Sequence, residues 1–426
     1  MKAKNAALTL TALLAFALAA CGGGDGGDDN PFGLEAQTIA EAPNPVSLTF
    51  APDGRLFFAE KYSGNIRVVD ARGALVSEPF AHVDAATWLD YQGLDWGLTG
   101  IALDPDFATN HYVYAFYTEA AGVSAGNEVT PSPSPGGPTP VADQVEATQD
   151  PNRPIARPVL VRFTARGNVG TDRTVIIGDF PESRLDHQGF KLNGALRTGP
   201  DDALYLSVGD YDWGKDGPDG TGAAADLSFP GGKILRIDTE GGFPPDNPFV
   251  DDSAFDDSTD SRIFAYGFSR AAPLAFHPAT GDLYAMDATD SCEEIDIVQA
   301  GRNYGWPDVG EFPFSDCYFG DQVRPVALVA GEGKQPGQFQ SVIVVSGLAF
   351  VSAAAYPALG DGLLVCSALD GLMRRLTFTG AQVTATDIVV RDCDRDVAVA
   401  PDGTIYYSNQ TGIIRLLTGA TPVASP

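Results

Sequence analysis

The chain has 426 residues, a formal net charge of −29 at pH 7, 48 glycines and 31 prolines. A surface with this excess of carboxylates repels phosphate backbones and anionic lipid, so nucleic-acid binding is not expected. Glycine and proline are frequent enough to separate many short strands, and no long stretch carries an apolar period of 3.6 residues, so the composition favours an all-β domain.

The first residues are typical of an export signal. Two lysines precede an apolar run that ends at Leu18-Ala-Ala-Cys21, which matches a lipobox whose cysteine is acylated and becomes the mature N-terminus. An ordinary secretory signal with a chance cysteine is the alternative. We expect residues 1–20 to be removed, and residues 21–34, rich in Gly and Asp at their start, to form a flexible tether. The protein is then an exported lipoprotein, periplasmic or at the cell surface, and held to a membrane by lipid alone. Glycine after the cysteine favours the outer membrane if the organism is Gram-negative.

Six times between residues 35 and 418 an apolar segment enters a turn of Pro, Asp or Gly and continues into a second apolar segment. Each passage predicts a β-hairpin, because Pro presets φ, Gly allows positive φ, and the flanking residues suit a buried sheet. Imperfect repetition at wide spacing is typical of a sheet repeated radially. We predict a six-bladed β-propeller of four-stranded antiparallel blades, with long loops at one end of the central channel. The hairpins cover residues 48–58, 101–116, 195–205, 274–284, 347–365 and 397–407.

Residues 126–150 differ in composition from the predicted blades. They contain a run in which proline alternates with Ser, Thr and Gly, a composition typical of an extended or disordered segment. We expect this insertion to interrupt the second blade and to lie outside it.

Two disulfides are predicted from the cysteines that remain once Cys21 carries lipid, because four thiols in an exported protein favour pairing. Four cysteines can form two disulfides in three ways, and their number alone does not choose among them. The spacing favours Cys292–Cys317 and Cys366–Cys393. No Cys-x-x-Cys or Cys/His cluster is present, so zinc and c-type haem are not expected.

Acidic residues are densest between residues 201 and 260. In residues 211–220 carboxylates alternate with glycine, which would allow several oxygens to converge on one Ca²⁺. A solvated acidic surface explains the same composition, particularly over residues 251–260.

The four histidines differ in context. His111 and His277 fall in turns, where a hydrogen bond to the backbone is the expected role. His187 stands just before the inner strand of a blade, and Asp210 ends the strand that follows. An imidazole beside a carboxylate at the mouth of the channel is an arrangement that orients and tunes a general base.

The sequence resembles the soluble quinoprotein glucose dehydrogenases and aldose sugar dehydrogenases, the glucose/sorbosone dehydrogenase family. The similarity runs in order over nearly the whole chain that follows the signal. It rests on Pro43–Gly54, Gly97–Phe107, the segment around His187, Ser207–Asp210, Gly231–Asp238, Asp246–Phe249, Glu293–Val298, Gly301–Pro307 and Arg395–Gly403.

The resemblance implies a propeller that oxidises an aldose at its anomeric carbon with pyrroloquinoline quinone and Ca²⁺. It implies that His187 is the base and Asp210 its supporting carboxylate. The cofactor-binding positions correspond to Asp95, Ser269, Arg270 and Arg395. The segment whose backbone carbonyls bind Ca²⁺ contains Gly-Pro in the family but reads Met286-Asp-Ala-Thr-Asp-Ser291 here, with Asp287 and Asp290 as the candidate ligands. The partners implied are a sugar and an electron acceptor that the sequence does not identify.

Several of these positions depart from the family pattern. Ser269 stands where the family has an arginine, and Arg270 stands where it has an asparagine. A shift of one residue would allow Arg270 to take the role of that arginine. Asp370 stands where the family has a lysine, and Cys393 lies near the place of a second arginine. An aspartate beside an anionic cofactor predicts repulsion. A propeller of the same descent that has lost the cofactor and binds a carbohydrate or a protein is therefore the alternative, whereas a Ca²⁺-dependent hydrolase would need a nucleophile arrangement that the sequence lacks.

Overall fold

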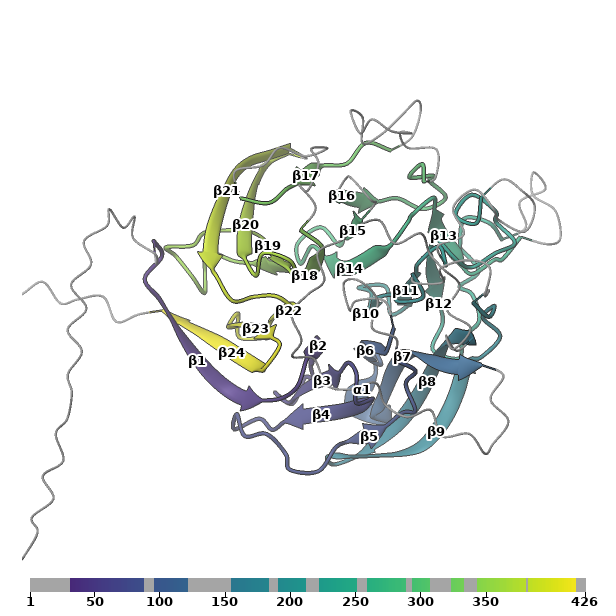
Figure 1. The fold of residues 1–426 in the computed structure, drawn as a ribbon, viewed down its shortest axis with the longest axis horizontal. Helices are drawn as coiled ribbons and strands as arrows, with labels where there is room; N and C mark the ends of the chain where they lie inside the picture. The colour runs from purple at the N-terminus through teal and green to yellow at the C-terminus, as the bar shows by residue number, and fades with distance from the viewer. Residues whose placement is uncertain are drawn as a thin grey trace, which may run out of the picture.

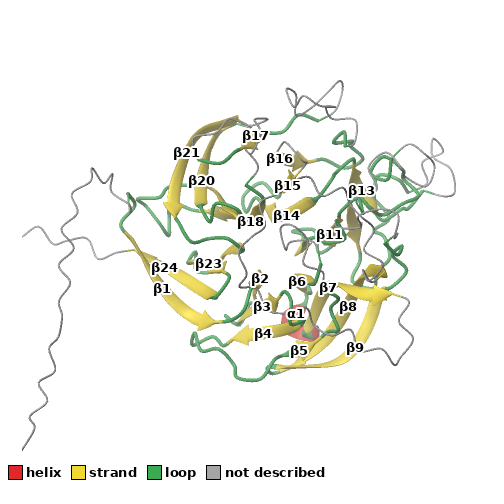
Figure 2. Cartoon of the chain, in the orientation of Figure 1, coloured by secondary structure: helices red, strands yellow, loops and turns green. Residues whose placement is uncertain are grey.

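The computed structural model describes residues 31–87, 96–121, 155–183, 191–211, 222–250, 259–288, 293–306, 323–332, 343–380 and 382–418. Across these ranges 24 strands form six four-stranded antiparallel sheets, and the sheets are arranged around a central axis (Figure 1). The helix content of the same ranges is the four-residue α1 (Phe107–Asn110), visible in Figure 2. The prediction of an all-β, six-bladed propeller is confirmed.

The four strands of each blade follow one another from the channel outward. Blades 1 to 3 contain β2 (Pro45–Phe50), β3 (Leu56–Glu60), β4 (Asn65–Val69) and β5 (Ala81–His82); β6 (Leu98–Leu103), β7 (Tyr112–Ala121), β8 (Ile155–Arg166) and β9 (Val169–Ile177); and β10 (Leu196–Thr198), β11 (Leu204–Val208), β12 (Lys233–Ile237) and β13 (Ile263–Tyr266). Blades 4 to 6 contain β14 (Ala271–Phe276), β15 (Leu283–Ala288), β16 (Glu293–Val298) and β17 (Ala327–Val329); β18 (Val345–Val351), β19 (Gly362–Ser367), β20 (Met373–Thr379) and β21 (Gln382–Val390); and β22 (Asp396–Val399), β23 (Ile405–Asn409), β24 (Gly412–Thr418) and β1 (Leu34–Glu41).

The predicted hairpins are the two innermost strands of each blade. In blades 1 and 6 the sequence Ala-Pro-Asp-Gly makes the same turn, because Gly54 and Gly403 both adopt a φ of 87°. In each case the glycine N–H donates to the carbonyl of the alanine three residues earlier. The turn chemistry therefore acts as the sequence predicts.

Apolar residues fill the space between neighbouring blades. The second strands β3, β11 and β15 are buried along their whole length, because a sheet that stacks against another blade on both faces needs two apolar faces. The innermost strands contact one another in a closed ring, from β2 through β6, β10, β14, β18 and β22 back to β2. They form the wall of the central channel.

The first strand of the described chain completes the last blade. β1 pairs with β24 in antiparallel register from Leu34 opposite Thr418 to Glu41 opposite Gly412. The predicted tether, residues 21–34, reaches into this region: Phe32 packs against the core of blades 5 and 6, and Leu34 opens β1. The start of the predicted propeller at residue 35 thus lies within one residue of the first strand.

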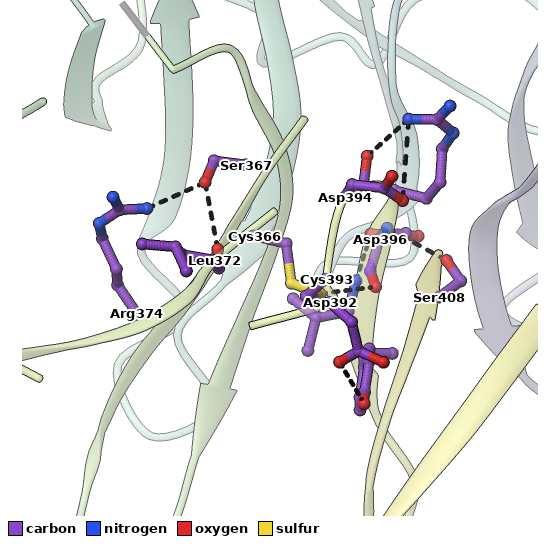
Figure 3. The surroundings of a disulfide bond; sticks show 12 residues. Cys366, Ser367, Leu372, Arg374, Asp392, Cys393, Asp394, Asp396 and Ser408 are labelled. Carbon is purple, nitrogen blue, oxygen red and sulfur yellow. Dashed lines mark hydrogen bonds and ion pairs between the residues drawn. A yellow bond between two sulfur atoms is a disulfide. The ribbon is translucent and has the colours of Figure 1, made fainter. Parts of the chain in front are cut away.

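The Cys366–Cys393 disulfide joins blade 5 to the segment that enters blade 6 (Figure 3). Cys366 lies in β19, Cys393 lies between β21 and β22, and both are fully buried. The Cys393 N–H donates to the Gly371 carbonyl at 2.8 Å, so the backbone beside the sulfur is also fixed. This predicted pairing is confirmed, whereas Cys21 and the Cys292–Cys317 pair lie outside the described residues, as does the insertion at 126–150.

The structure also describes the turn that contains His277. His277 Nδ1 accepts hydrogen bonds from the backbone N–H groups of Ala279 and Thr280, each at 3.2 Å, so its expected role in a turn is confirmed. Over the described residues, no helix has the length and hydropathy needed to cross a bilayer.

Candidate functional site

The predicted site residues that the structure describes lie at one end of the propeller. In antiparallel blades, the segment after the second strand and the segment that enters the next blade leave the sheets at the same end. Asp210 follows β11, Ser269 and Arg270 precede β14, and Arg395 precedes β22. His187, Asp95 and Asp290 lie outside the described residues.

A cavity at this end of the channel is lined by four cationic side chains from four blades. They are Lys61 after β3, Arg197 in β10, Arg270 before β14 and Arg395 before β22. Asp396 is the acidic residue among the described lining residues. In a chain with a net charge of −29, four cations around one cavity create a local positive potential that favours an anionic ligand.

Asp396 is bound chiefly by the backbone. Its Oδ2 accepts from the Leu48 N–H and its Oδ1 from the Val397 N–H, each at 2.8 Å. The nearest guanidinium nitrogen, Arg197 Nη2, is 4.0 Å from Oδ2. Burial raises the pKa of Asp396. Asp396 therefore serves mainly to join β22 to β2.

Arg395 is held in place by neighbours that accept its hydrogen bonds. Its Nη2 donates to Asn44 Oδ1 at 3.0 Å, and its Nη1 donates to the Asp394 carbonyl at 2.8 Å. Figure 3 shows that Asp394 follows the disulfide residue Cys393. The cross-link thus fixes the segment that presents Arg395 to the cavity.

Asp287 fixes the segment that contains Ser269 and Arg270. Its Oδ2 accepts from the Ser269 N–H at 3.0 Å, and its Oδ1 accepts from the Arg270 N–H at 2.6 Å. Burial raises the pKa of Asp287 to about 6, although these two hydrogen bonds and the Lys191 charge oppose the shift. In the part of the chain that the structure describes, no three His, Cys, Asp or Glu side chains converge as metal ligands. The roles of Asp287 and Asp290 as calcium ligands stay predictions.

Asp210 belongs to a buried polar network next to this segment. Its Oδ2 accepts from the indole N–H of Trp306 at 2.5 Å, and its Oδ1 is 3.9 Å from Lys191 Nζ. Lys191 Nζ also donates to Ser269 Oγ at 2.8 Å and lies 4.9 Å from the centre of the Trp306 ring. A cation therefore contacts Ser269, the position at which the sequence lacks the arginine typical of the family.

Asp370 does not present an uncompensated negative charge. Arg374 donates to both of its carboxylate oxygens, through Nη2 to Oδ2 and at 3.2 Å through Nη1 to Oδ1. Ser367 Oγ also donates to Oδ1. Burial acts to raise the pKa of Asp370, but the bonds from Arg374 and Ser367 outweigh it and hold the pKa below its ordinary value. The repulsion predicted from Asp370 alone is thus offset by Arg374.

Four residues of this region were not singled out by the sequence: Lys61, Lys191, Arg197 and Trp306. Trp306 and Lys191 belong to segments that carry the family resemblance. Their position in these segments could have indicated that they lie near the site. Arg197 lies in a hairpin for which the sequence predicts only a structural role. The sequence contains no local signal that it faces the same cavity as Arg395, 198 positions later.

The glucose/sorbosone dehydrogenase family matches residues 42–417. The chain is 26% identical to the aldose sugar dehydrogenase YliI of Escherichia coli over 368 residues, which cover 85% of this chain and 86% of the relative. It is 27% identical to quinoprotein glucose dehydrogenase B of Acinetobacter calcoaceticus over 302 residues, which cover 66% of this chain but only 53% of that protein.

Solved structures share the fold. The apo-form of the soluble aldose sugar dehydrogenase from Escherichia coli superposes with a TM-score of 0.68 at 21% identity, covering 90% of this chain and 99% of that one. The form of the Streptomyces coelicolor aldose sugar dehydrogenase that contains pyrroloquinoline quinone gives a TM-score of 0.60 at 20% identity, with 91% and 99% covered.

Proposed function

Because the chain belongs to the glucose/sorbosone dehydrogenase family, we propose that it is a sugar dehydrogenase that oxidises an aldose at its anomeric carbon with pyrroloquinoline quinone. The observation that carries the proposal is the cavity at the end of the channel, where Lys61, Arg197, Arg270 and Arg395 converge and the one described carboxylate, Asp396, is bound by backbone N–H groups. Pyrroloquinoline quinone carries three carboxylates, and arginine binds such groups through paired N–H donors.

The residues around the cavity fit this cofactor in charge and in hydrogen-bonding capacity. Arg270 and Arg395 would hold its carboxylates, and Asp287 keeps Arg270 in place through the backbone. Asp370, paired with Arg374, does not oppose an anion. When bound, the quinone would be the oxidant that accepts hydride from the sugar.

The chain's own contribution to the reaction is to place a base and hold it. Asp210 is fully buried, and the Trp306 indole and the Lys191 ammonium fix the direction of its carboxylate. A carboxylate fixed in this way orients an imidazole that removes a hydroxyl proton. The resemblance assigns that imidazole to His187.

Two further features belong to the proposal. We propose that Ca²⁺ accompanies the quinone, on the basis of the family resemblance alone, and that Cys21 carries a lipid anchor. The substituted position Ser269 favours a second candidate, a propeller without cofactor that binds a carbohydrate or a protein. The two functions differ in whether the purified protein binds the quinone.

The test is a titration of the dialysed protein with pyrroloquinoline quinone in the presence of Ca²⁺, followed by absorbance and by calorimetry. We expect one bound quinone per chain and aldose-dependent reduction of an electron-accepting dye. Arg395→Gln should weaken binding by about 10-fold or more, the size of a charged hydrogen bond. Arg72→Gln removes the same charge from a side chain that is 89% exposed and should leave binding unchanged. A wild-type protein that binds no quinone would overturn the proposal in favour of the binding propeller.

A further inference from the structure

Three buried oxygens without hydrogen-bond partners line the same cavity. They are Thr99 Oγ1 in β6, Asn193 Oδ1 just before β10 and Ser346 Oγ in β18. None of the three makes a hydrogen bond to any other residue that the structure describes. Buried polar atoms in folded proteins are nearly always bonded, so three such atoms around one space indicate a place for a polar ligand group.

Arg197 lies among these oxygens with most of its donors unused. Its side chain is 20% exposed. Its Nη1 donates to the Leu196 carbonyl at 3.0 Å, and its separation of 4.0 Å from Asp396 Oδ2 is too long for a hydrogen bond. Within the described chain, Nε and Nη2 of Arg197 have no hydrogen-bond acceptor. They therefore remain available to an anion in the cavity.

The position of Arg197 makes it the floor of this cavity. The cavity is lined by the first residues of the innermost strands, such as Val46 in β2 and Thr99 in β6. A second hollow is lined by later residues of the same strands, including Leu48 and Ile101. Arg197 lines both spaces, so its side chain lies where one ends and the other begins. Arg270 and Arg395 belong to the segments between blades and lie nearer the mouth.

The size of the space selects a small group. The cavity has a volume of about 90 Å³, about three times the share of one water molecule in the liquid. A whole cofactor needs a pocket of roughly 300–1,000 Å³, whereas a single carboxylate fits here. The guanidinium of Arg197 can donate to its oxygens, as can the hydroxyls of Thr99 and Ser346, and the amide of Asn193 can donate after it turns over.

We propose that Arg197, Thr99, Asn193 and Ser346 form a carboxylate-binding floor at the bottom of the cavity. The proposal rests on the proposed function, because the carboxylate is assigned to pyrroloquinoline quinone. In this proposal Arg197 of blade 3 contacts the cofactor and supplies the positive charge that the family's arginine would supply at position 269. Arg197 and the three oxygens would hold one carboxylate of the cofactor, and Arg270 and Arg395 would hold the others.

The test is calorimetry with the full chain without cofactor, in which pyrroloquinoline quinone and malonate are separate probes. Arg197→Gln should weaken quinone binding by about 10-fold or more, and Arg72→Gln, which makes the same change of charge on the surface, should leave it within about 2-fold. Thr99→Val removes one unbonded oxygen while keeping the shape of the side chain. It should raise the melting temperature of the protein without ligand and weaken quinone binding, two opposite effects that a purely structural residue would not produce.

The outcomes separate the two proposals. If the wild type binds the quinone and Arg197→Gln binds it equally well, the floor is overturned and the proposed function stands. If the wild type binds malonate but not the quinone, and Arg197→Gln loses malonate, the floor stands as a carboxylate site and the dehydrogenase proposal falls. If neither probe binds the wild type, both proposals are wrong.

Discussion

Trp306 donates its indole N–H to the Asp210 carboxylate at 2.5 Å, across 96 positions of sequence. The bond connects the loop after β11 in blade 3 with the segment that follows β16 in blade 4. The same indole ring lies against Lys191 Nζ. One side chain thus fixes both charged groups of the network beside the cavity.

Replacing Trp306 tests the importance of that bond. Trp306→Phe keeps an aromatic ring near Lys191 but removes the donor to Asp210. We expect turnover with the quinone to fall by about 10-fold or more, because a charged hydrogen bond of roughly 1.5–3 kcal/mol is lost from the group that orients the base. Steady-state kinetics measures this effect, and binding of the quinone should change far less. Unchanged turnover would remove Asp210 from the reaction.

His187 is the predicted base. General-base catalysis contributes typically ~10²–10⁴-fold, so His187→Ala should lower turnover by that factor and leave quinone affinity largely intact. Absorbance of the bound quinone and single-turnover kinetics measure the two properties separately. A variant as active as the wild type would assign the proton transfer to another group.

Blade 4 should make stability depend on pH. Burial raises the pKa of Glu293 to about 7, although the N–H groups of Val345 and Val344 donate to its carboxylate. The folded state therefore holds this proton more tightly than the unfolded state, in which the ordinary value is 4.5. The stability contributed by the protonated form is complete below about pH 4.5 and is lost as the pH rises through about 7. Asp287, with a pKa raised to about 6, acts in the same direction at lower pH.

Urea denaturation at pH 5 and pH 8 measures this loss. Glu293→Gln stays neutral at both values, so its free energy of unfolding should fall by about 2.5 kcal/mol less than that of the wild type between the two. Glu78→Gln, an exposed site, is the control and should keep the wild-type difference. Equal slopes for all three proteins would mean that Glu293 titrates at its ordinary pKa.

The confirmed disulfide closes a loop with a sequence separation of 27 residues. In the chain-entropy description, a cross-link over a loop of this length stabilises the folded state by roughly 3–4 kcal/mol. Cys366→Ser combined with Cys393→Ser should lower the free energy of unfolding by this order. Because Arg395 follows Cys393 closely, quinone affinity should fall as well. Retention of full affinity would show that the Asn44 and Asp394 contacts hold Arg395 without the cross-link.

The proposed lipid at Cys21 predicts the location of the protein in cell fractions. Cys21→Ala should move the protein from the membrane fraction to the soluble fraction, because residues 22–29, which are all Gly or Asp, add no apolar surface of their own. Detergent partitioning and mass spectrometry of the N-terminal peptide measure the change. A variant that stays with the membranes would rule out this anchor.

The hairpins could be predicted from the sequence because their signals are local. Ala-Pro-Asp-Gly specifies a turn within four residues, and it makes the same turn at Gly54 and at Gly403. The role of residues 34–41 could not be predicted in this way, because β1 finds its partner β24 only when the ring closes. Pairing over such a distance leaves no pattern within either segment.

The same contrast applies to the site. Asp210, Arg270 and Arg395 could be proposed as site residues because they lie in or near segments that resemble the family, and the structure places them at one end of the propeller. Arg197 and the pairing of Asp370 with Arg374 could not, because only the fold brings their partners close. Asp370 considered alone predicts repulsion, whereas Asp370 with Arg374 four residues later is an ion pair.

The pairing of β1 with β24 also means that closure of the ring does not depend on the number of blades. In the first five blades the repeating unit of the sequence is one whole blade, such as β2 to β5. The sheet that joins the two ends of the chain instead contains β22, β23, β24 and β1. Duplication or deletion of one whole four-strand unit in a gene would therefore leave the joining sheet intact. A break inside blade 6 would instead abolish closure whatever the number of blades. Growth or shrinkage of such a ring in evolution is thus restricted to units that begin and end outside the composite blade.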